Sequence, residues 1–435
     1  MARKMKDSGI EWIGEIPEGW EVIPIKYLAR YNYDTLTESC SPDFEFNYID
    51  IGSVTYGKGI TTFQKFKFKD SPSRARRVVT PGDILISTVR TYLRAIACVN
   101  KSSIPQIAST GFLVLQADSS KLPPQFLMYA VLADSFICNV EAHSVGISYP
   151  AINASQIVHF KIPLPPSTEQ IPLINYLDNH CSKIDVLLSK IHSSIEEYKK
   201  LKQAVITQAV TKGVRGEREM KDSGVDYIGQ IPAKWVLGKL RNVGDTQNGI
   251  SKSSEFFGKG FPFVSYSDVY KNYSLPFAVS GLVESTPEEQ ERYSVKEGDI
   301  FFTRTSETIE EVGFSCVCEK DIPNATFAGF LIRVRPFSDK LHTPYAKYYF
   351  RSSHLRFYLV KEMNLVTRAS LGQSLLKSMP VLLPPLEEQK EIADHLDAKC
   401  AEIDRLIAKK EQLVKELESY KKSLIYEVVT GKREV

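Results

Sequence analysis

Several features that would assign this chain to a specialised class are missing from its 435 residues. It has no run of about 18 or more apolar residues, and residues 1–20 lack the apolar segment of a secretion signal, so we expect a cytoplasmic protein. The seven cysteines include no C-x-x-C pair, and their odd number fits a reducing compartment better than a disulfide framework or a zinc site. A net charge of +3 is only weakly basic, so nucleic-acid binding would have to come from local patches.

Candidate metal ligands are also sparse. Cys316 and Cys318 lie two positions apart on a predicted strand, and we expect them to be packed thiols. The seven histidines are scattered, and His395 lies near Cys400 in a stretch with helical periodicity. We therefore expect no metal site in this chain.

The chain repeats itself. The segment "MKDSGIEWIGEIPEGW" at 5–20 returns 215 residues later as "MKDSGVDYIGQIPAKW" at 220–235, with ten of sixteen positions identical. A second pair, "LPPSTEQIPLINYLDNHCSKID" at 164–185 and "LPPLEEQKEIADHLDAKCAEID" at 383–404, shares ten of twenty-two positions. The residues between these segments barely resemble each other. The sequence therefore predicts two copies of one frame, formed by the repeated segments. Each copy holds a different intervening region, which we call a filling.

The second repeated pair opens two long stretches in which apolar residues step by four and three, interrupted at Lys202, Lys410 and Lys421. This spacing predicts two helices of about 45 residues, roughly 65 Å each, with a heptad seam. A helix that lies on its own domain would show a similar stripe, but two equal helices in one chain favour an antiparallel pair. That pair would place the two fillings about two DNA turns apart. The predicted seam residues are Leu177, Ile184, Leu188, Ile191, Ile195, Leu396, Ile403, Ile407, Val414 and Leu417.

The ends of these helices carry their own signals. Ser167 and Gln170 have the spacing of a capping box at the start of the first helix. Gly213 and Gly431 fall where the two helices would stop, and glycine is the residue that most often follows a helix.

The fillings are predicted to be rich in β-structure. "RRVVTPGDILISTVR" predicts a strand, a tight turn at Pro81 to Asp83 and a second strand, and "EGDIFFT" at 297–303 repeats its centre. In "TTFQKFKFKD" at 61–70, phenylalanines alternate with lysines, which predicts a strand with one apolar and one cationic face. An edge strand protected by lysines has the same pattern. Three nearby arginines favour a phosphate-binding surface.

Candidate DNA contacts occur in both fillings. Arginine, serine, threonine and glutamine can bind base edges as well as phosphates, although any one of them can equally be a solvated surface residue. In the first filling the candidates are Lys65, Lys67, Lys69, Arg74, Arg76, Arg77, Thr88 and Arg90. In the second filling they are Thr303, Arg304, Thr305, Arg368, Ser370 and Gln373.

Two "GxIPxxW" segments, two "LPPxxEQ" segments that open long helices, and a final "VVTGK" at 428–432 resemble the specificity subunit of type I restriction-modification enzymes. The resemblance covers the whole chain in the right order, twice. It implies an α+β fold in which two β-rich target-recognition domains are joined by two conserved helices that form an antiparallel coiled coil, with an internal pseudo-twofold repeat. The first helix departs mildly from the family pattern, since it ends "AVTKG" at 209–213 rather than "VVTGK".

The resemblance also implies domain boundaries and partners. The target-recognition domains would span 1–165 and 214–384, and the conserved helices 166–213 and 385–435. The partners would be double-stranded DNA, two modification subunits that bind S-adenosylmethionine and methylate adenine, and restriction subunits that translocate and cut DNA with ATP and magnesium. The chain itself would hold no cofactor and no catalytic site, and it would direct methylation and restriction to a bipartite, asymmetric DNA site.

Two other classes of protein fit the sequence less well. An autonomous nuclease or methyltransferase is disfavoured because "GSVTYGKG" at 52–59 has glycine where a P-loop needs serine or threonine, and it fits a hairpin loop better. Pro165 and Pro384 follow leucines, whereas adenine methyltransferases place Asn or Asp before Pro-Pro. A coiled-coil adaptor that never touches DNA would leave the cationic strands unexplained. A steep salt dependence of DNA binding would separate it from a DNA-binding subunit.

Overall fold

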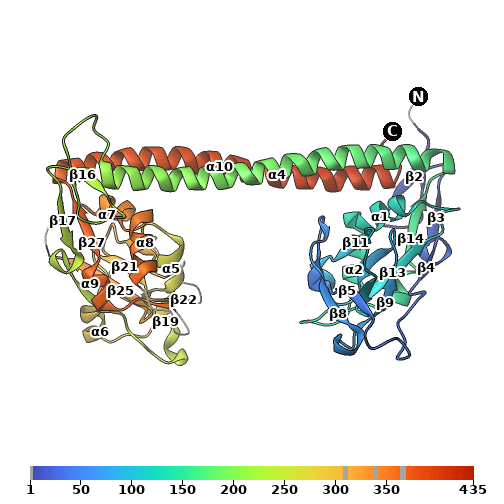
Figure 1. Ribbon diagram of the computed structural model, residues 1–435, viewed down its shortest axis with the longest axis horizontal. Coiled ribbons are helices and arrows are strands. Elements are labelled where there is room, and N and C mark those ends of the chain that lie inside the picture. The colour runs from blue at the N-terminus through green and yellow to red at the C-terminus, as the bar shows by residue number, and fades with distance from the viewer. Residues whose placement is uncertain (1–2, 307–311, 338–339, 363–368) are drawn as a thin grey trace. The chain divides into compact units, whose positions relative to one another are not determined.

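The computed structural model describes residues 3–306, 312–337, 340–362 and 369–435. The chain divides into two compact units, which we name unit 1 (1–191 and 412–435) and unit 2 (192–411). Each unit combines one β-rich part with a segment of each long helix (Figure 1). Among the described helices, none has the length and apolar character needed to cross a bilayer.

Unit 1 contains two four-stranded sheets. The first is antiparallel, with the order β11-β10-β13-β4, and the second has the order β8-β5-β12-β9, in which β5 and β12 are parallel. The strands are β4 (Ala29–Tyr31), β5 (Glu45–Ile49), β8 (Gln64–Lys67), β9 (Ala75–Val79), β10 (Ile84–Ser87), β11 (Ile96–Cys98), β12 (Gln106–Ser109) and β13 (Phe112–Ala117). All four residues of β10 are buried, and the predicted turn at Pro81 to Asp83 joins strands of two different sheets.

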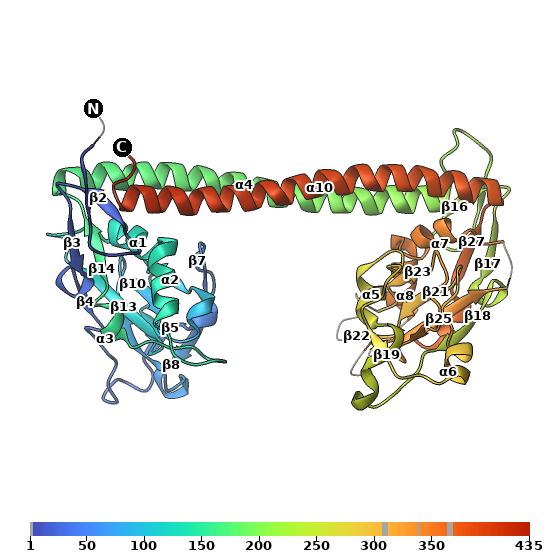
Figure 2. The same ribbon diagram turned by 180° about the vertical axis from the view of Figure 1, so that it is seen from behind.

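Unit 2 repeats this plan. Its first sheet has the order β18-β25-β21-β23, and its second the order β20-β19-β24 with β19 and β24 parallel. The strands are β18 (Gly244–Asn248), β19 (Phe257–Val264), β20 (Leu282–Val283), β21 (Ile300–Thr303), β23 (Ser315–Val317), β24 (Thr326–Phe327) and β25 (Leu331–Pro336). Two fillings with little sequence identity therefore share the strand order of the first sheet, while the second sheet has three strands in unit 2 and four in unit 1 (Figure 2).

Smaller elements complete both units. The paired short strands are β1 (Met5–Asp7) with β2 (Glu15–Pro17), β3 (Glu21–Pro24) with β14 (Lys161–Leu164), β6 (Val54–Thr55) with β7 (Gly59–Ile60), β15 (Met220–Asp222) with β16 (Gln230–Pro232), β17 (Val236–Lys239) with β27 (Pro380–Leu383), and β22 (Thr305–Ser306) with β26 (Ala369–Ser370). The short helices are α1 (Pro124–Leu132), α2 (Asp134–Ala142), α3 (Ala154–Ile157), α5 (Tyr266–Lys271), α6 (Pro287–Arg292), α7 (Thr343–Tyr349), α8 (Ser353–Glu362) and α9 (Gln373–Ser378). Single 3-10 turns are η1 (Ile25–Tyr27), η2 (Ile51–Ser53), η3 (Phe68–Asp70), η4 (Thr91–Leu93), η5 (Leu240–Asn242) and η6 (Ser254–Phe256).

The two long helices are α4 (Ser167–Lys212) with 46 residues and α10 (Leu386–Val429) with 44, which confirms the predicted length. They run antiparallel. In unit 1, Lys421 forms an ion pair with Asp185 at 2.6 Å, while Arg433, after the end of α10, bonds to Tyr176, an earlier residue of α4. In unit 2, Lys202 forms the corresponding ion pair with Asp404 at 2.6 Å. Two of the lysines that interrupt the seam therefore connect the helices.

Burial along the helices follows the heptad pattern. The buried seam residues are Leu177, Ile184, Ile195, Leu396, Ile403 and Val414, and the half-buried ones are Leu188, Ile191, Ile407 and Leu417. The outer parts of both helices also belong to the domain cores. Leu173 and Val428 join the core of unit 1, and Ile206 and Ile392 join that of unit 2. The helices thus pair with each other and also close a β-rich core in each unit.

The structure corrects two local predictions and confirms a third. Ser167 is the first helical residue rather than a cap, and Gln170 donates from Nε2 to the carbonyls of Pro165 and Lys121 instead of closing a capping box. The predicted strand over 61–70 ends at Lys67 and continues as η3. Gly213 and Gly431 do end the helices, with φ of 76° and 70°.

Two further predictions are also confirmed, one made against a P-loop and one against metal-ligating cysteines. The 52–59 segment forms most of the β6–β7 hairpin. Cys316 and Cys318 are 1% exposed, and burial raises the pKa of both thiols to about 12, as expected of packed thiols.

Candidate nucleic-acid interface

The repeated "GxIPxxW" segments and the helix starts meet in one polar contact. In unit 1, Glu169 at the start of α4 accepts a hydrogen bond from the indole of Trp20 at 3.0 Å and forms an ion pair with Arg3 at 2.5 Å. The guanidinium of Arg3 also lies over the Trp20 ring, 5.4 Å from its centroid. The Trp of "GxIPxxW" and the Glu of "LPPxxEQ" are therefore contact partners.

Unit 2 contains the same contact. Glu388 accepts the Trp235 indole at 3.0 Å and forms an ion pair with Arg218, whose guanidinium lies 5.4 Å from the Trp235 ring centroid. The two copies differ in burial, since the Glu388 side chain is 3% exposed and that of Glu169 is 34% exposed. We call each trio of Arg, Trp and Glu a tryptophan lock. Its arginine was missed in the sequence, although Arg3 and Arg218 both stand two residues before the repeated Met-Lys-Asp.

The turns marked "GDI" are held by buried carboxylates. Asp83 is 1% exposed and accepts bonds from the Thr80 backbone at 2.7 Å and the Tyr33 hydroxyl at 2.6 Å. Burial and this carboxylate raise the pKa of Tyr33 to about 12. These contacts fix the path of the chain into β10.

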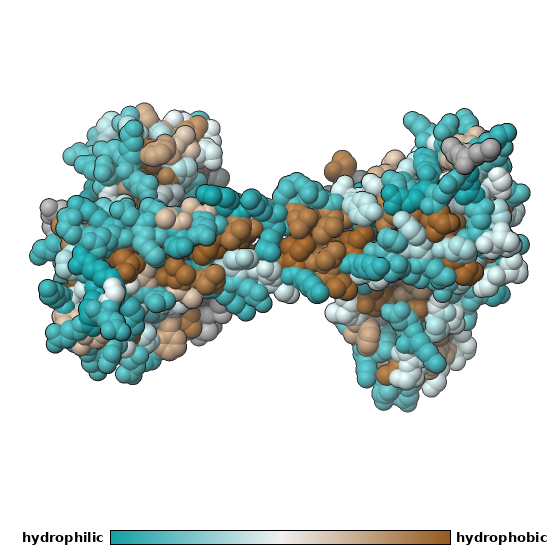
Figure 3. All heavy atoms as spheres, turned by 90° about the horizontal axis from the view of Figure 1, so that it is seen from above, coloured by the Kyte–Doolittle hydropathy of each residue, from teal (hydrophilic) through white to brown (hydrophobic). Residues whose placement is uncertain are grey.

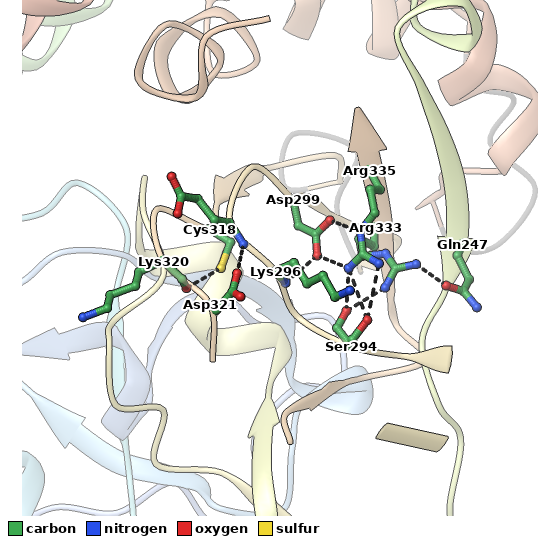
Figure 4. A network of polar contacts seen from close by, with 10 residues as sticks. Gln247, Ser294, Lys296, Asp299, Cys318, Lys320, Asp321, Arg333 and Arg335 are labelled. Carbon is green, nitrogen blue, oxygen red and sulfur yellow. Dashed lines mark hydrogen bonds and ion pairs between the residues drawn. The ribbon is translucent and has the colours of Figure 1, made fainter. Parts of the chain in front are cut away.

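Asp299 has the same place in unit 2 with different partners (Figure 4). It is fully buried and accepts bonds from the Lys296 backbone at 2.8 Å and from two nitrogens of Arg335, each at 2.7 Å. The carboxylate raises the pKa of Arg335, whereas burial lowers the pKa of neighbouring Arg333. The Gly-Asp-Ile turn therefore supports the sheet, and the charges of Asp299 and Arg335 pair within the fold.

The residue directly after the "GDI" strand has the same backbone setting in both units. The amide of Thr88 donates to Gly111 O at 2.8 Å, and the Thr88 carbonyl accepts from Ile152 N at 2.9 Å. In unit 2 the amide of Arg304 donates to Phe330 O at 2.9 Å, and its carbonyl accepts from Leu371 N at 2.7 Å. One position held by the same two bonds thus carries a threonine in unit 1 and an arginine in unit 2. We call it the strand-end position. Thr88 is buried and its hydroxyl donates to Gly111 O at 2.9 Å, whereas Arg304 is half-buried.

Two of the predicted lysines of unit 1, Lys65 and Lys67, lie on β8, the outermost strand of its sheet, and Lys69 lies on η3 directly after it. Lys65, Lys67 and Lys69 are all exposed. Lys69 forms an ion pair with Asp43 at 3.0 Å, and Lys67 lies within 4 Å of Asp43 and Glu45. Lys65 forms no ion pair within the described part of the chain, so its charge remains available.

The predicted arginines of unit 1 also differ in exposure and in their partners. Arg74 is exposed, while Arg76 forms an ion pair with Glu38 at 3.0 Å and lies over the Phe68 ring. Arg90 is exposed, and its guanidinium lies 5.0 Å from the Tyr149 ring centroid. Arg77 is half-buried, and its Nε has no hydrogen-bond partner among the residues described. Burial lowers the pKa of Arg77.

Arg77 and Thr88 meet in a cavity of about 480 Å³. Its walls mix amide and hydroxyl groups with apolar ones, and they come from Asn32, β9 and the segments 88–89, 110–112 and 145–156. The lining residues that concern us are Arg77, Thr88, Val89, Val145, Ile152 and Gln156. This composition suits a nucleobase edge better than an isolated phosphate, because a base offers both an apolar face and hydrogen-bonding atoms.

The candidates in unit 2 are placed less uniformly. Thr303 is fully buried, and its hydroxyl accepts from Phe314 N at 2.9 Å, so this side chain lies inside the fold. Thr305 and Ser370 face each other in the β22–β26 pair. Gln373 bonds to Thr246 and Asn248 at 2.8 and 3.0 Å. Arg368 lies outside the described residues.

Sequence reasoning also missed an exposed apolar loop at 144–150, which follows α2. Its side chains Val145, Ile147 and Tyr149 are 81%, 102% and 66% exposed. Their alternation with Gly146 and Ser148 was a visible signal. Within the described residues, no three His, Cys, Asp or Glu side chains gather as metal ligands would.

Comparison with known proteins first assigns a class to the two units. A model of the type I restriction modification DNA specificity domain matches residues 17–197 and 232–417, one match in each half of the repeat. Because the matches cover well over half of the chain, it belongs to this family of DNA-recognition proteins.

Relatives named as specificity subunits extend the match over nearly the full chain. The MjaVIII specificity subunit of Methanocaldococcus jannaschii is 26% identical over 428 residues, covering 96% of this chain and 93% of the relative. The EcoKI specificity subunit of Escherichia coli K12 is 23% identical, covering 90% and 84%. The chain is thus the DNA specificity subunit of a type I restriction-modification system, a non-catalytic subunit class, as the sequence predicted.

Solved structures share the fold. A structure from a study of complex assembly in the type I system has a TM-score of 0.76 with 23% identity, covering 96% of this chain and 99% of that one. The crystal structure of the HsdS subunit from Thermoanaerobacter tengcongensis has a TM-score of 0.50 with 23% identity, covering 96% and 98%. These likenesses confirm the predicted α+β class with two long packed helices.

Proposed function

We propose that this specificity subunit reads a bipartite, asymmetric DNA site, with one β-rich domain for each half-site. The observation that carries the proposal is the strand-end position. Both units hold it with the same two backbone hydrogen bonds, yet it is a buried threonine, Thr88, in one and a half-buried arginine, Arg304, in the other. A constant frame with a changed side chain is what two different half-sites require. We assign the two domains to residues 1–165 and 214–384.

The candidate contacts with free charge support this role. Lys65 and Arg74 in unit 1 and Arg304 in unit 2 form no ion pair among the described residues, so they can neutralise phosphates or bind base edges. Lys67, Lys69 and Arg76 already have carboxylate neighbours, and their contribution to DNA affinity is smaller. The DNA surface is therefore formed by a few groups in each unit, as the weak net charge requires.

The adenine-methylating partners are two modification subunits, and restriction subunits complete the assembly. The duplicated frames, which the tryptophan locks hold together, offer each modification subunit an equivalent surface, although the chain itself is asymmetric. Exposed apolar side chains on the helices are a second docking element. Figure 3 shows brown side chains along the helices, where Val186, Leu187 and Leu413 are 53%, 48% and 43% exposed.

The chemistry belongs to these partners. S-adenosylmethionine is bound by the modification subunits, and ATP and magnesium by the restriction subunits, while this chain positions the DNA. The reaction site is adenine N6, which the modification subunit reaches by extruding the base. The complex works in the cytoplasm, where the DNA is.

A methylation assay on the purified complex of this chain with its modification subunits tests the assignment. Arg304→Ala is expected to lower discrimination against base changes in one half-site about tenfold or more, since one good base contact contributes about 1–3 kcal/mol. Discrimination in the other half-site is expected to stay as in the wild type. Lys221→Ala, an exposed cation on strand β15, is the matched control and is expected to change neither.

Equal relaxation of both half-sites in Arg304→Ala would show that the two units do not read separate halves. An unchanged pattern would remove Arg304 from the recognition surface. A wild-type complex that methylates adenines without a two-part motif would contradict the proposed function as a whole.

A further inference from the structure

Loop 144–150 presents the three most exposed large apolar side chains of unit 1 among the described residues, Val145, Ile147 and Tyr149. Ile147, at its centre, is as exposed as an isolated side chain, with a relative accessibility of 102%. Exposure of three such side chains to water is unfavourable, and binding to a partner that buries them would be favoured by the hydrophobic effect.

The loop is a fixed projection. Val145 and Ala151 exchange two backbone hydrogen bonds of 2.8 and 3.0 Å, which close its base. The Ser144 hydroxyl accepts a bond from Thr91 at 2.9 Å. Gly146 has a φ of 118°, and a Cβ there would lie 3.1 Å from the Tyr149 carbonyl, so the tight path depends on glycine.

Groups that can contact DNA lie on both sides of the loop. Arg90 stacks on Tyr149 at 5.0 Å and holds an exposed positive charge beside the apolar tip. Val145 also lines the cavity that contains Arg77, whose Nε lacks a hydrogen-bond partner within the described residues. A cation, an apolar point and a polar cavity therefore occur side by side. The residue that follows the loop base, Ile152, bonds to the strand-end position.

We propose that loop 144–150 inserts the side chain of Ile147 into the base stack of the half-site that unit 1 binds. Arg90 contacts the adjacent phosphate, and the Arg77 cavity receives the edge of the displaced base pair. Isoleucine is among the side chains that proteins use as wedges between base steps, where they unstack and kink the duplex. The proposal rests on the proposed function and names Ile147 as a further residue that determines specificity, because unstacking cost depends on the base step.

Duplex DNA fits this surface better than a protein partner does. A protein-docking patch would need an apolar area broader than one loop tip. Here the apolar tip is flanked by Arg90 and by the donors of the Arg77 cavity, which complement phosphates and base edges.

The test uses the assembled complex with its modification subunits and duplexes carrying the mapped site. 2-Aminopurine replaces each base of the half-site of unit 1 in turn, except the adenine that is methylated. The wild type is expected to raise the fluorescence several-fold at one step, and Ile147→Ser is expected to return it to the level of free duplex and weaken binding several-fold. A mismatch at that step is expected to restore binding by Ile147→Ser, since a mismatched pair is already easier to unstack.

Phe277→Ser is the matched control, because Phe277 is a 74% exposed apolar side chain in unit 2. It is expected to leave the signal in the half-site of unit 1 unchanged. Fluorescence that stays at the free-duplex level in the wild type, or that persists in Ile147→Ser, would overturn the proposal. Loss of modification-subunit binding by Ile147→Ser without DNA would overturn it in favour of a protein contact. If the wild type methylated no two-part site, the proposed function would fail first.

Discussion

The two tryptophan locks predict that one substitution has unequal effects in the two halves of the chain. Glu388 is almost fully buried and accepts bonds from Trp235 and Arg218, so Glu388→Ala leaves a buried indole and a largely buried guanidinium without their partner. Loss of one member of a buried ion pair costs about 3–5 kcal/mol. Glu169 has equivalent partners but is 34% exposed, and water can replace part of what it provides. For Glu169→Ala we therefore expect about 1–2 kcal/mol.

Hydrogen exchange measures the two effects separately, which matters because a chain with two units need not unfold in one step. The amides of β15 and β16 report on the lock of unit 2, and those of β1 and β2 on that of unit 1. Protection in the β15–β16 hairpin is expected to fall about fivefold or more further in Glu388→Ala than protection in the β1–β2 hairpin falls in Glu169→Ala, since the two costs differ by about 1 kcal/mol or more. Equal losses, or a larger loss in Glu169→Ala, would refute the argument from burial.

Three further predictions concern pH, packing and DNA binding. Burial lowers the pKa of His354 to about 4. In the unfolded chain this histidine has a pKa of about 6.5, so the unfolded state binds the proton first as the pH falls. The stability of unit 2 is therefore expected to fall by about 3 kcal/mol between pH 6.5 and 4. His354→Phe should remove this part of the pH dependence in urea titrations, and an unchanged slope would contradict it. Leu396→Ala, at a fully buried seam position, is expected to lower the free energy of unfolding by about 2–5 kcal/mol in thermal unfolding. Asp404→Ala removes a side chain that is 54% exposed and should cost about 0.5 kcal/mol. Comparable losses in the two variants would show that burial in the seam does not stabilise the helix pair. Lys65→Ala is expected to reduce the slope of the logarithm of the DNA-binding constant against the logarithm of salt concentration by about 1. Lys67→Ala is expected to reduce it by less, because Lys67 already has carboxylate neighbours. A larger reduction in Lys67→Ala than in Lys65→Ala would exclude Lys65 from the DNA surface.

The frame could be predicted from the sequence because it depends on local patterns that occur twice. Heptad spacing predicted the length and the seam of the helices, two equal helices in one chain favoured an antiparallel pair, and glycine after the last heptad predicted their ends. The capping box at Ser167 failed for a tertiary reason, since the Gln170 side chain finds the carbonyls of Pro165 and Lys121. A local rule cannot anticipate such a partner.

The recognition surface was harder to predict, because similar side chains have different surroundings. Lys65 and Lys67 are two residues apart on one strand, yet only Lys67 lies within ion-pair distance of carboxylates. Thr303 looked like a base-reading hydroxyl and is instead bonded inside the fold. Loop 144–150 carries no charged side chain, and its exposure depends on the bonds that anchor it to Thr91 and Ala151.

We propose that this chain by itself determines which two-part DNA site its partners methylate. Long-read mapping of N6-methyladenine in a methylation-free host that expresses the modification subunit, with and without this chain, tests it most directly. We expect a motif of two defined halves around an undefined spacer, methylated on opposite strands only when this chain is present. Methylation that is unchanged without the chain, or that the chain produces without the modification subunit, would contradict the account.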